Sequence, residues 1–288
     1  MTEDAAAQPY LRLGLIGWPL GHSLSPRLHA AALTAAGLQG EYCLYPVPPL
    51  PEGSAALADR LEDLRQGRLD GLNVTIPHKQ AVLSALDELS PAAHAIGAAN
   101  TLFARRGRLL GHNTDALGFL ADLARLGFTG QNALVLGAGG SARAVCYALL
   151  GAGWQVSVTA RRLEQAQALA SALGSSSTAL CVEPFEPAAL TQPFSLIINT
   201  TPVGMFPNVA ASPWPDGVPF PIGAAVYDLV YNPAETALVR SARAAGLSAA
   251  TGLGMLVEQA ALAFELWTGQ VISRAPLWQA IGVEVQTI

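Results

Sequence analysis

The sequence predicts an α/β protein of two domains, built on mostly parallel sheets. Three observations support this prediction. Short apolar runs alternate along the chain with segments of helical spacing. A glycine-rich turn, GAGGSA at 137–142, directly follows one apolar run and opens a helix. The length of 288 residues is typical of about two domains.

The first half of the chain begins with an apolar run, 11–16, that ends at Gly17 and predicts a strand. Ser25 and Pro26 then have the pattern of a helix N-cap followed by proline in the first helical position. Gly37 is the expected stop of that helix. A second strand is expected over 70–76, after which Pro77 turns the chain.

The second half shows the alternation more strongly. Apolar runs predict four further strands, over 133–137, 155–160, 195–201 and 224–231. Helical spacing predicts helices over 115–126, 141–150, 163–173 and 255–268. Strand, glycine turn, helix and strand in this order are typical of a nucleotide-binding unit.

The composition excludes several classes of protein. Hydrophobic residues make up 51% of the chain and charged residues 13%, so a disordered chain is excluded. The net charge of -5 without a basic tract argues against a nucleic-acid partner. The acidic N-terminus and the absence of long apolar runs favour a cytoplasmic protein without a membrane span. The cysteine and histidine spacing predicts no metal site, and monomer and homodimer both stay open.

The glycine-rich turn has the small residues of a dinucleotide fingerprint. Its candidate cofactor residues are Gly137, Ala138, Gly139, Gly140, Ser141 and Ala142. Arg161 and Arg162 follow the next expected strand, where an NAD-binding protein would have an acid. Two guanidinium groups suit the 2′-phosphate of NADP, so NADP is the predicted cofactor. The alternatives are an ordinary glycine-rich turn and two solvated arginines.

Lys79 is the only lysine, and the other fifteen basic residues of the sixteen are arginines. Removal of a hydride from an alcohol carbon requires that the hydroxyl proton also leave. A lysine can accept that proton beside an orienting carboxylate, whereas arginine cannot. Lys79 and Asp115 are therefore the predicted catalytic pair, with chance retention of one lysine as the alternative.

Small polar side chains gather in four stretches outside the glycine turn: GHSLSP, NVTIPHK, GAANT and HNTDALG. Ser23 and Ser25 lie at a helix start, where hydroxyls and free amides suit a carboxylate, although Ser25 taken alone is better explained as a plain N-cap. Asn73, Thr75, Asn100 and Asp115 are candidates to bond a substrate hydroxyl, or to cap turns. A surface or capping role is expected for each histidine, with His22 and His112 as possible lining residues.

Together these motifs resemble the shikimate dehydrogenase family, in the family's order, with NTTPVGM, DLVYNP and GMLVEQ as further matches. The resemblance implies a substrate domain of 1–113 plus 253–288, an NADP-binding Rossmann domain of 114–252, and a cleft between them. It implies reversible NADPH-dependent reduction of 3-dehydroshikimate to shikimate in aromatic amino-acid biosynthesis. The implied substrate residues are Ser23, Ser25, Thr75, Lys79, Asn100, Asp115, Tyr231 and Gln259.

The resemblance also implies which residues lie against the nicotinamide: Thr200, Thr201, Val203, Met205, Val230, Gly252 and Met255. One stretch departs from the family, because Ala160-Arg161-Arg162 stands where Asn-Arg-Thr is usual. Three alternatives stay open beside the leading hypothesis. They are an enzyme that also accepts quinate, a relative that prefers NAD, and a non-catalytic binding module of the same fold.

Overall fold

The computed structural model describes residues 10–174 and 179–282. The acidic N-terminal segment lies outside these described residues, apart from Tyr10. The chain divides into two compact units, each with its own six-stranded sheet. The first unit holds the chain up to Ala93, Ala99–Thr114 and the part from Ala260 on. The second unit holds His94–Ala98 and Asp115–Gln259.

The sheet of the first unit has the strand order β2-β1-β3-β5-β6-β4. Its strands are β1 (Leu11–Gly17), β2 (Gly40–Pro46), β3 (Gly71–Val74), β4 (Glu88–Leu89), β5 (Thr101–Arg105) and β6 (Arg108–His112). β1 runs parallel to β2 and β3, while β5 runs antiparallel to both β3 and β6. The expected strands at 11–16 and 70–76 correspond to β1 and β3.

The prediction of mostly parallel sheets therefore holds for part of this sheet only. β5 and β6 are joined by the two residues Arg106 and Gly107, which have positive φ angles of 53° and 74°. Such a short turn can join only antiparallel neighbours, since a parallel crossover needs a dozen residues or more.

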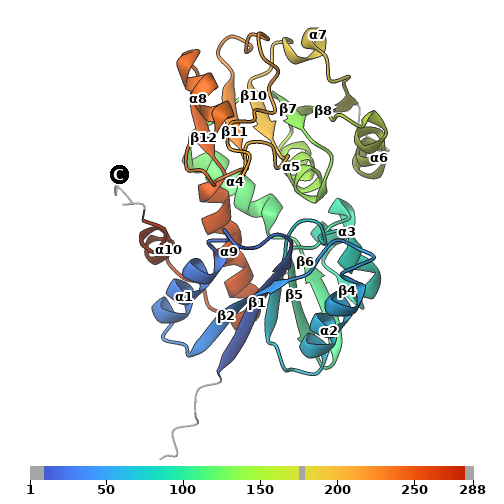
Figure 1. The fold of residues 1–288 in the computed structure, drawn as a ribbon, viewed down its shortest axis with the longest axis vertical. Coiled ribbons are helices and arrows are strands. Elements are labelled where there is room, and N and C mark those ends of the chain that lie inside the picture. Colours follow the sequence, from blue (N-terminus) through green and yellow to red (C-terminus); the bar gives the residue numbers. More distant parts are fainter. Residues whose placement is uncertain (1–9, 175–178, 283–288) are drawn as a thin grey trace, which may run out of the picture. The chain divides into compact units, whose positions relative to one another are not determined.

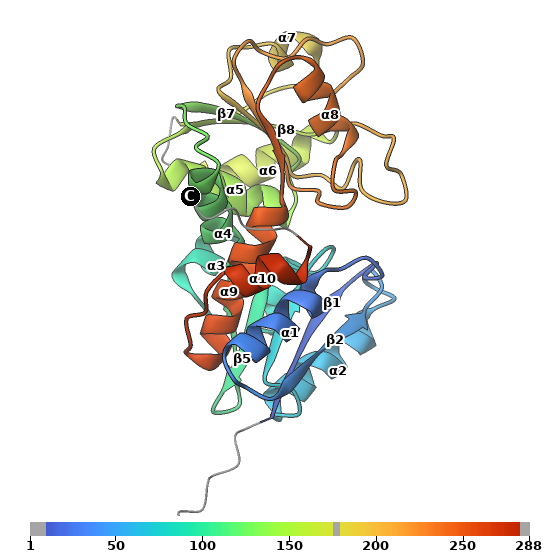
Figure 2. The ribbon, with the colours of Figure 1, turned by 90° about the vertical axis from the view of Figure 1, so that its left-hand side faces the viewer.

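Helices cover both faces of this sheet. They are α1 (Ser25–Ala35), α2 (Ser54–Arg65), α10 (Ala275–Ala280) and the 3₁₀ helix η1 (Ala81–Ala85). α1 packs on α10 and β2, whereas α2 packs on β5 and β6 (Figures 1 and 2). Leu61, Leu64, Leu72 and Leu102 belong to the core on the α2 side.

Two histidines of the first unit are buried, so the expected surface or capping role is wrong for them. His29 stacks on Tyr42 with ring centroids 4.3 Å apart, and burial lowers its pKa to about 3. His78 is 1% exposed and its Nε2 lies 2.8 Å from the carbonyl oxygen of Val47. Both imidazole rings pack in the interior, and the spacing of histidines along the sequence does not predict such burial.

The sheet of the second unit is entirely parallel, in the order β12-β11-β10-β7-β8-β9. Its strands are β7 (Asn132–Leu136), β8 (Gln155–Thr159), β9 (Leu180–Val182), β10 (Leu196–Asn199), β11 (Ala225–Asp228) and β12 (Ala249–Thr251). This is the doubly wound order, with its switch point between β7 and β10. The predicted Rossmann topology is confirmed for this unit.

The helices of the second unit follow the strands. They are α4 (Asp115–Arg125), α5 (Gly140–Gly151), α6 (Leu163–Gly174), α7 (Pro187–Leu190) and α8 (Ala237–Ala244) (Figure 1). α5 packs on β7 and β8, and α8 packs on β11 and β12. Two helices have residues in both units: α3 (Pro91–Ile96) and α9 (Leu253–Thr268). Within the described ranges no helix is long and apolar enough to cross a bilayer.

Candidate active site

In the first unit, the ends of β1 and β3 lie in close contact. The two strands are parallel neighbours, and the Thr75 amide donates to the Ile16 carbonyl at 2.8 Å. A Cβ on Gly17 would lie only 2.3 Å from the Thr75 methyl carbon. Glycine at 17 therefore lets the stretches GHSLSP and NVTIPHK leave the sheet side by side.

Ser23 and Ser25 have different roles at the start of α1. The helix begins at Ser25, and Leu24 is its N-cap residue, so the expectation that Ser25 caps the helix is wrong. The Ser23 hydroxyl instead accepts from the Ser25 amide at 3.2 Å. Because the Ser25 hydroxyl is not used as the cap, the alternative that explained it without a ligand is removed.

Asn100 is held rigidly where β3, β5 and β6 meet. Its Oδ1 accepts from the Thr114 amide at 2.8 Å, and its Nδ2 donates to the Thr114 hydroxyl at 2.9 Å. Its backbone carbonyl accepts from Val74 and from the Asn73 side chain. Asn73 on β3 in turn accepts from the hydroxyl of Tyr42 on β2 at 2.8 Å, so this hydrogen bond spans the intervening strand β1.

Lys79 lies on a segment that is bonded to the GAANT stretch. Its carbonyl accepts from the Ala99 amide at 2.8 Å, one residue before Asn100. Thr75, Lys79 and Asn100 therefore share one edge of the first sheet. His112, at the same end of β6, stacks on Phe103 at 5.3 Å, and burial lowers its pKa. His22 is exposed.

The other candidate substrate residues belong to the second unit. Asp115 follows Thr114 directly, opens α4 and is 4% exposed. Tyr231 comes three residues after β11 ends, and the Gln259 side chain donates to the Leu256 carbonyl at 2.9 Å within α9.

The glycine turn lies at the switch point of the second sheet, as a dinucleotide site requires. Gly137 has a φ of 112°, and a Cβ there would lie 2.6 Å from the Thr200 hydroxyl oxygen. A Cβ on Gly139 would meet nothing within 4 Å, and Ala142, in the first turn of α5, is fully buried. The turn therefore exposes backbone at Gly139 and at the start of a twelve-residue helix, where an anion is favoured.

Arg161 and Arg162 lie just beyond the end of β8. The Gly137 amide donates to the Thr159 carbonyl at 2.8 Å, which holds the end of β8 beside the glycine turn. Both arginine side chains are exposed to solvent. They stand where a charged phosphate on the adenosine ribose can be paired.

The loops after β10 and β11 are joined by a buried polar network that the sequence did not single out. Asn199 accepts from the Thr201 amide at 2.9 Å and donates to Asp228 at 2.8 Å. Asp228 also accepts from the Val230 amide and from the Thr236 hydroxyl, which caps α8. The signal that could have found it is the coincidence of an Asn and an Asp at the carboxyl ends of two apolar strands.

The start of α9 is held against α4 and β11. The Met255 amide donates to Asp122 at 3.1 Å, and the Tyr227 hydroxyl donates to the same oxygen at 2.6 Å. A Cβ on Gly254 would lie 1.9 Å from that carboxylate, and one on Gly252 would lie 2.5 Å from the Leu229 carbonyl. Gly252 and Met255 thus lie near Val230 at the carboxyl end of the sheet.

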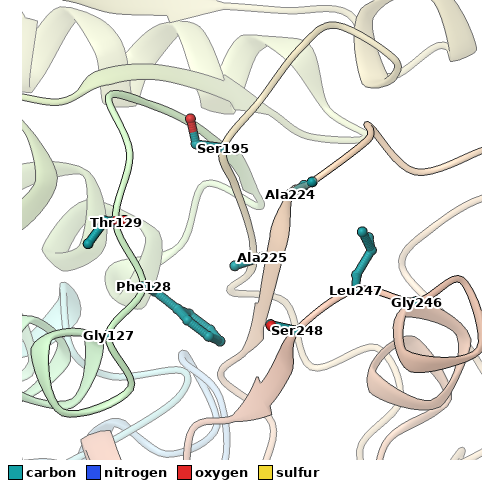
Figure 3. Close-up of a pocket in the computed structure, with 10 residues that line it drawn as sticks. Gly127, Phe128, Thr129, Ser195, Ala224, Ala225, Gly246, Leu247 and Ser248 are labelled. Atoms are coloured by element: carbon teal, nitrogen blue, oxygen red, sulfur yellow. The ribbon is translucent and has the colours of Figure 1, made fainter.

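A pocket of about 280 Å³ lies at the opposite, amino edge of the second sheet (Figure 3). Phe128, Ser195, Leu247 and Ser248 are among its lining residues. None of the predicted site residues lines it.

Two family models match the chain. One, described as the shikimate dehydrogenase substrate binding domain, matches residues 15–102. The other, described as the shikimate 5′-dehydrogenase C-terminal domain, matches residues 252–281.

Individual relatives match almost end to end. Shikimate dehydrogenase (NADP(+)) of Salinibacter ruber is 45% identical over 98% of this chain and 99% of its own. The crystal structure of shikimate 5-dehydrogenase from Thermus thermophilus, in complex with NADP(H) and shikimate, has a TM-score of 0.83 and 42% identity, covering 94% of this chain and 98% of the other. Quinate dehydrogenase from Corynebacterium glutamicum, in complex with NAD, has a TM-score of 0.84 and 31% identity, with the same coverage. The chain belongs to the shikimate dehydrogenase family.

Proposed function

We propose that this protein is an NADP-dependent shikimate dehydrogenase that reversibly reduces 3-dehydroshikimate to shikimate, a step of aromatic amino-acid biosynthesis. The observation that carries the proposal is the 45% identity, over 98% of the chain, with a shikimate dehydrogenase (NADP(+)). The first unit, with the C-terminal segment, binds the substrate, and the second unit binds NADP. A cytoplasmic location and a monomeric or homodimeric state belong to the same proposal.

The residues of the second unit fit a dinucleotide. The pyrophosphate is assigned to the backbone of Gly137, Gly139 and the start of α5, where no Cβ stands in the way at Gly139. The 2′-phosphate is assigned to Arg161 and Arg162, and the nicotinamide to the loops after β10 and β11 and to the start of α9. When bound, NADPH supplies the hydride that reaches the substrate carbon.

The substrate contacts are assigned by chemistry. The hydroxyls of Ser23 and Ser25 hold the carboxylate, with Tyr231 near them. Thr75, Asn100, Asp115 and Gln259 bond the ring hydroxyls. The rigid Asn100 amide supports this assignment, because a fixed donor and acceptor discriminates between hydroxyl positions.

Lys79 and Asp115 are assigned the proton transfer. As the ketone carbon receives a hydride, the ketone oxygen takes a proton from the Lys79 ammonium and becomes the hydroxyl. In the oxidative direction the neutral amine accepts that proton. The Asp115 carboxylate orients the lysine and stabilises its charged form.

The test is the pair Lys79→Met and Lys79→Arg. Both variants should lower kcat by about a thousandfold while the KM for shikimate changes little, because the lost interaction concerns proton transfer. Arginine keeps the positive charge but does not release a proton. An active Lys79→Arg variant would show that charge, rather than proton transfer, is what the position supplies.

Use of quinate or NAD is the second candidate, favoured by the structural match to a quinate dehydrogenase in complex with NAD. Specificity constants for shikimate and quinate, each with NADP and NAD, decide between the two. A higher constant with NAD would contradict the role given to Arg161 and Arg162.

A further inference from the structure

Asp228 is a buried carboxylate at the carboxyl end of β11. Asp228 is fully buried. Its Oδ1 accepts from Asn199 Nδ2 at 2.8 Å and from the Val230 amide at 3.0 Å. Its Oδ2 accepts from the Thr236 hydroxyl at 2.6 Å. One side chain therefore gathers donors from three separate segments.

These donors lead directly to the loops assigned to the nicotinamide. Through Asn199, the carboxylate fixes Thr201, whose hydroxyl then accepts from the Val203 amide at 3.2 Å. Through Val230 it fixes the first turn after β11. Thr236 in turn caps α8, a helix of the scaffold, by accepting from the Val239 amide.

Stability alone does not explain a carboxylate here. Its three hydrogen-bond donors are all uncharged, so nothing in direct contact compensates the buried charge. Burial raises the pKa of Asp228 to about 6, which shows that the fold disfavours the ionised form despite three donors. An uncharged residue of similar shape would avoid this cost, whereas the carboxylate supplies both acceptor oxygens for the three donors.

We infer that Asp228 is a positioning residue for the nicotinamide end of the cofactor, acting through Asn199 and Val230 on the two loops that contact it. This inference rests on the proposed function, which assigns Thr200, Thr201, Val203 and Val230 to the nicotinamide. Asp228 itself touches neither substrate nor cofactor. It sets the distance between the two loops, and that distance decides how the nicotinamide is oriented.

The experiment compares Asp228→Asn and Asp228→Ala with the control Asn132→Ala. Asn132 makes similar hydrogen bonds to Ser195 and Pro193 at the other end of the same sheet. The asparagine side chain keeps one acceptor oxygen, but an NH2 group replaces the oxygen that accepts from the Thr236 hydroxyl. We expect the KM for NADP to rise about threefold in Asp228→Asn and tenfold or more in Asp228→Ala, with kcat falling in the same order.

The KM for shikimate should stay within about twofold in both variants, since their contacts belong to the cofactor side. Asn132→Ala should lower the melting temperature and leave both KM values and kcat unchanged. The inference is overturned if Asp228→Asn keeps the wild-type kcat and KM for NADP, whether or not Asp228→Ala folds. An equal rise of both KM values would also overturn it. Wild-type protein that fails to oxidise shikimate with NADP would instead refute the proposed function.

Discussion

Two edges of the second sheet are braced by the same device. At the amino edge, Asn132 on β7 accepts from the Ser195 amide at 3.1 Å and from the Ser195 hydroxyl. At the carboxyl edge, Asn199 on β10 accepts from the Thr201 amide at 2.9 Å and from the Thr201 hydroxyl at 2.7 Å. The two asparagines differ in where their Nδ2 atoms end: one on the carbonyl of Pro193, the other on the buried carboxylate of Asp228.

The two edges also differ in space. The pocket of about 280 Å³ is at the amino edge (Figure 3). At the carboxyl edge, Gly137 is in close contact with Thr200. Ligands of open α/β sheets bind at the carboxyl ends of the strands. The presence of this pocket therefore does not by itself mark the amino edge as functional. The buried carboxylate of Asp228 distinguishes the carboxyl edge better, because close-packed glycines occur at both edges.

Among changes that compare the two edges, the largest expected effect comes from a methyl group added at Gly137, just after β7; Gly130, just before β7, offers the same change at the other edge. In Gly137→Ala, the Cβ would lie 2.6 Å from the Thr200 hydroxyl oxygen at the carboxyl edge. In Gly130→Ala, it would lie 2.3 Å from the Ser195 Cβ at the amino edge. We expect Gly137→Ala to lower kcat/KM for NADP by about a hundredfold or more, because the loop that carries Thr200 must move.

The Gly130→Ala variant is the matched control. Its close contact should cost about 1 to 3 kcal/mol of unfolding free energy, with kinetics near those of the wild type. Steady-state kinetics and thermal unfolding of both variants check this. Equal kinetic losses in the two variants would remove the functional distinction between the edges.

The second prediction, of intermediate size, concerns stability. It follows from the ionisable carboxylate of Asp228 at the carboxyl edge, which has no counterpart in the Asn132 network at the amino edge. The pKa of Asp228 is raised from 3.8 to about 6 in the fold, so its stabilising contribution is present below pH 3.8 and is lost as the pH rises through 6. Asp228→Asn cannot ionise. Relative to the wild type it should therefore gain about 2 kcal/mol of unfolding free energy between pH 4 and pH 7.

Denaturant unfolding at several pH values measures this gain. Asn132 bonds only uncharged groups, Ser195 and Pro193. The unfolding free energy of Asn132→Ala should therefore differ from that of the wild type by the same amount at each pH. A pH-independent difference for Asp228→Asn as well would mean that Asp228 ionises in the fold as freely as in the unfolded chain.

The sequence predicted more of the second unit than of the first, although β9, β12, α7 and α8 of the second unit were not predicted. The run at 133–137 is almost continuously buried, and the stretch 155–160 has buried valines at 156 and 158, so both stand out; the observed strands β7 and β8 agree within a residue. In the first unit, the strands β2, β4, β5 and β6 were not predicted. β4 has two residues, and β5 and β6 form a hairpin whose Arg106-Gly107 turn is not one of the common turn signals.

For the proposed site, the sequence predicted Gly137 because the dinucleotide fingerprint occupies six consecutive residues, 137–142. It missed Asn199 and Asp228, whose bond joins residues 29 positions apart. It also missed Asp122, which occupies a helix position that resembles a solvated one. Only the fold brings Tyr227 to it, from 105 residues away. Residues that position others are visible only through such long-range contacts.

The smallest expected effect concerns the pocket itself. Ser248 lines it, and Ser248→Leu would place an apolar side chain beside Phe128 and Leu247 (Figure 3). If the amino edge has no part in binding or chemistry, both KM values and kcat should stay within about twofold of the wild type. The melting temperature should also change little, because substitutions at exposed positions usually alter the unfolding free energy by about 0.5 kcal/mol or less. A loss of activity with intact folding would show that the pocket communicates with the carboxyl edge through β7 and β10, and that the two edges are not independent.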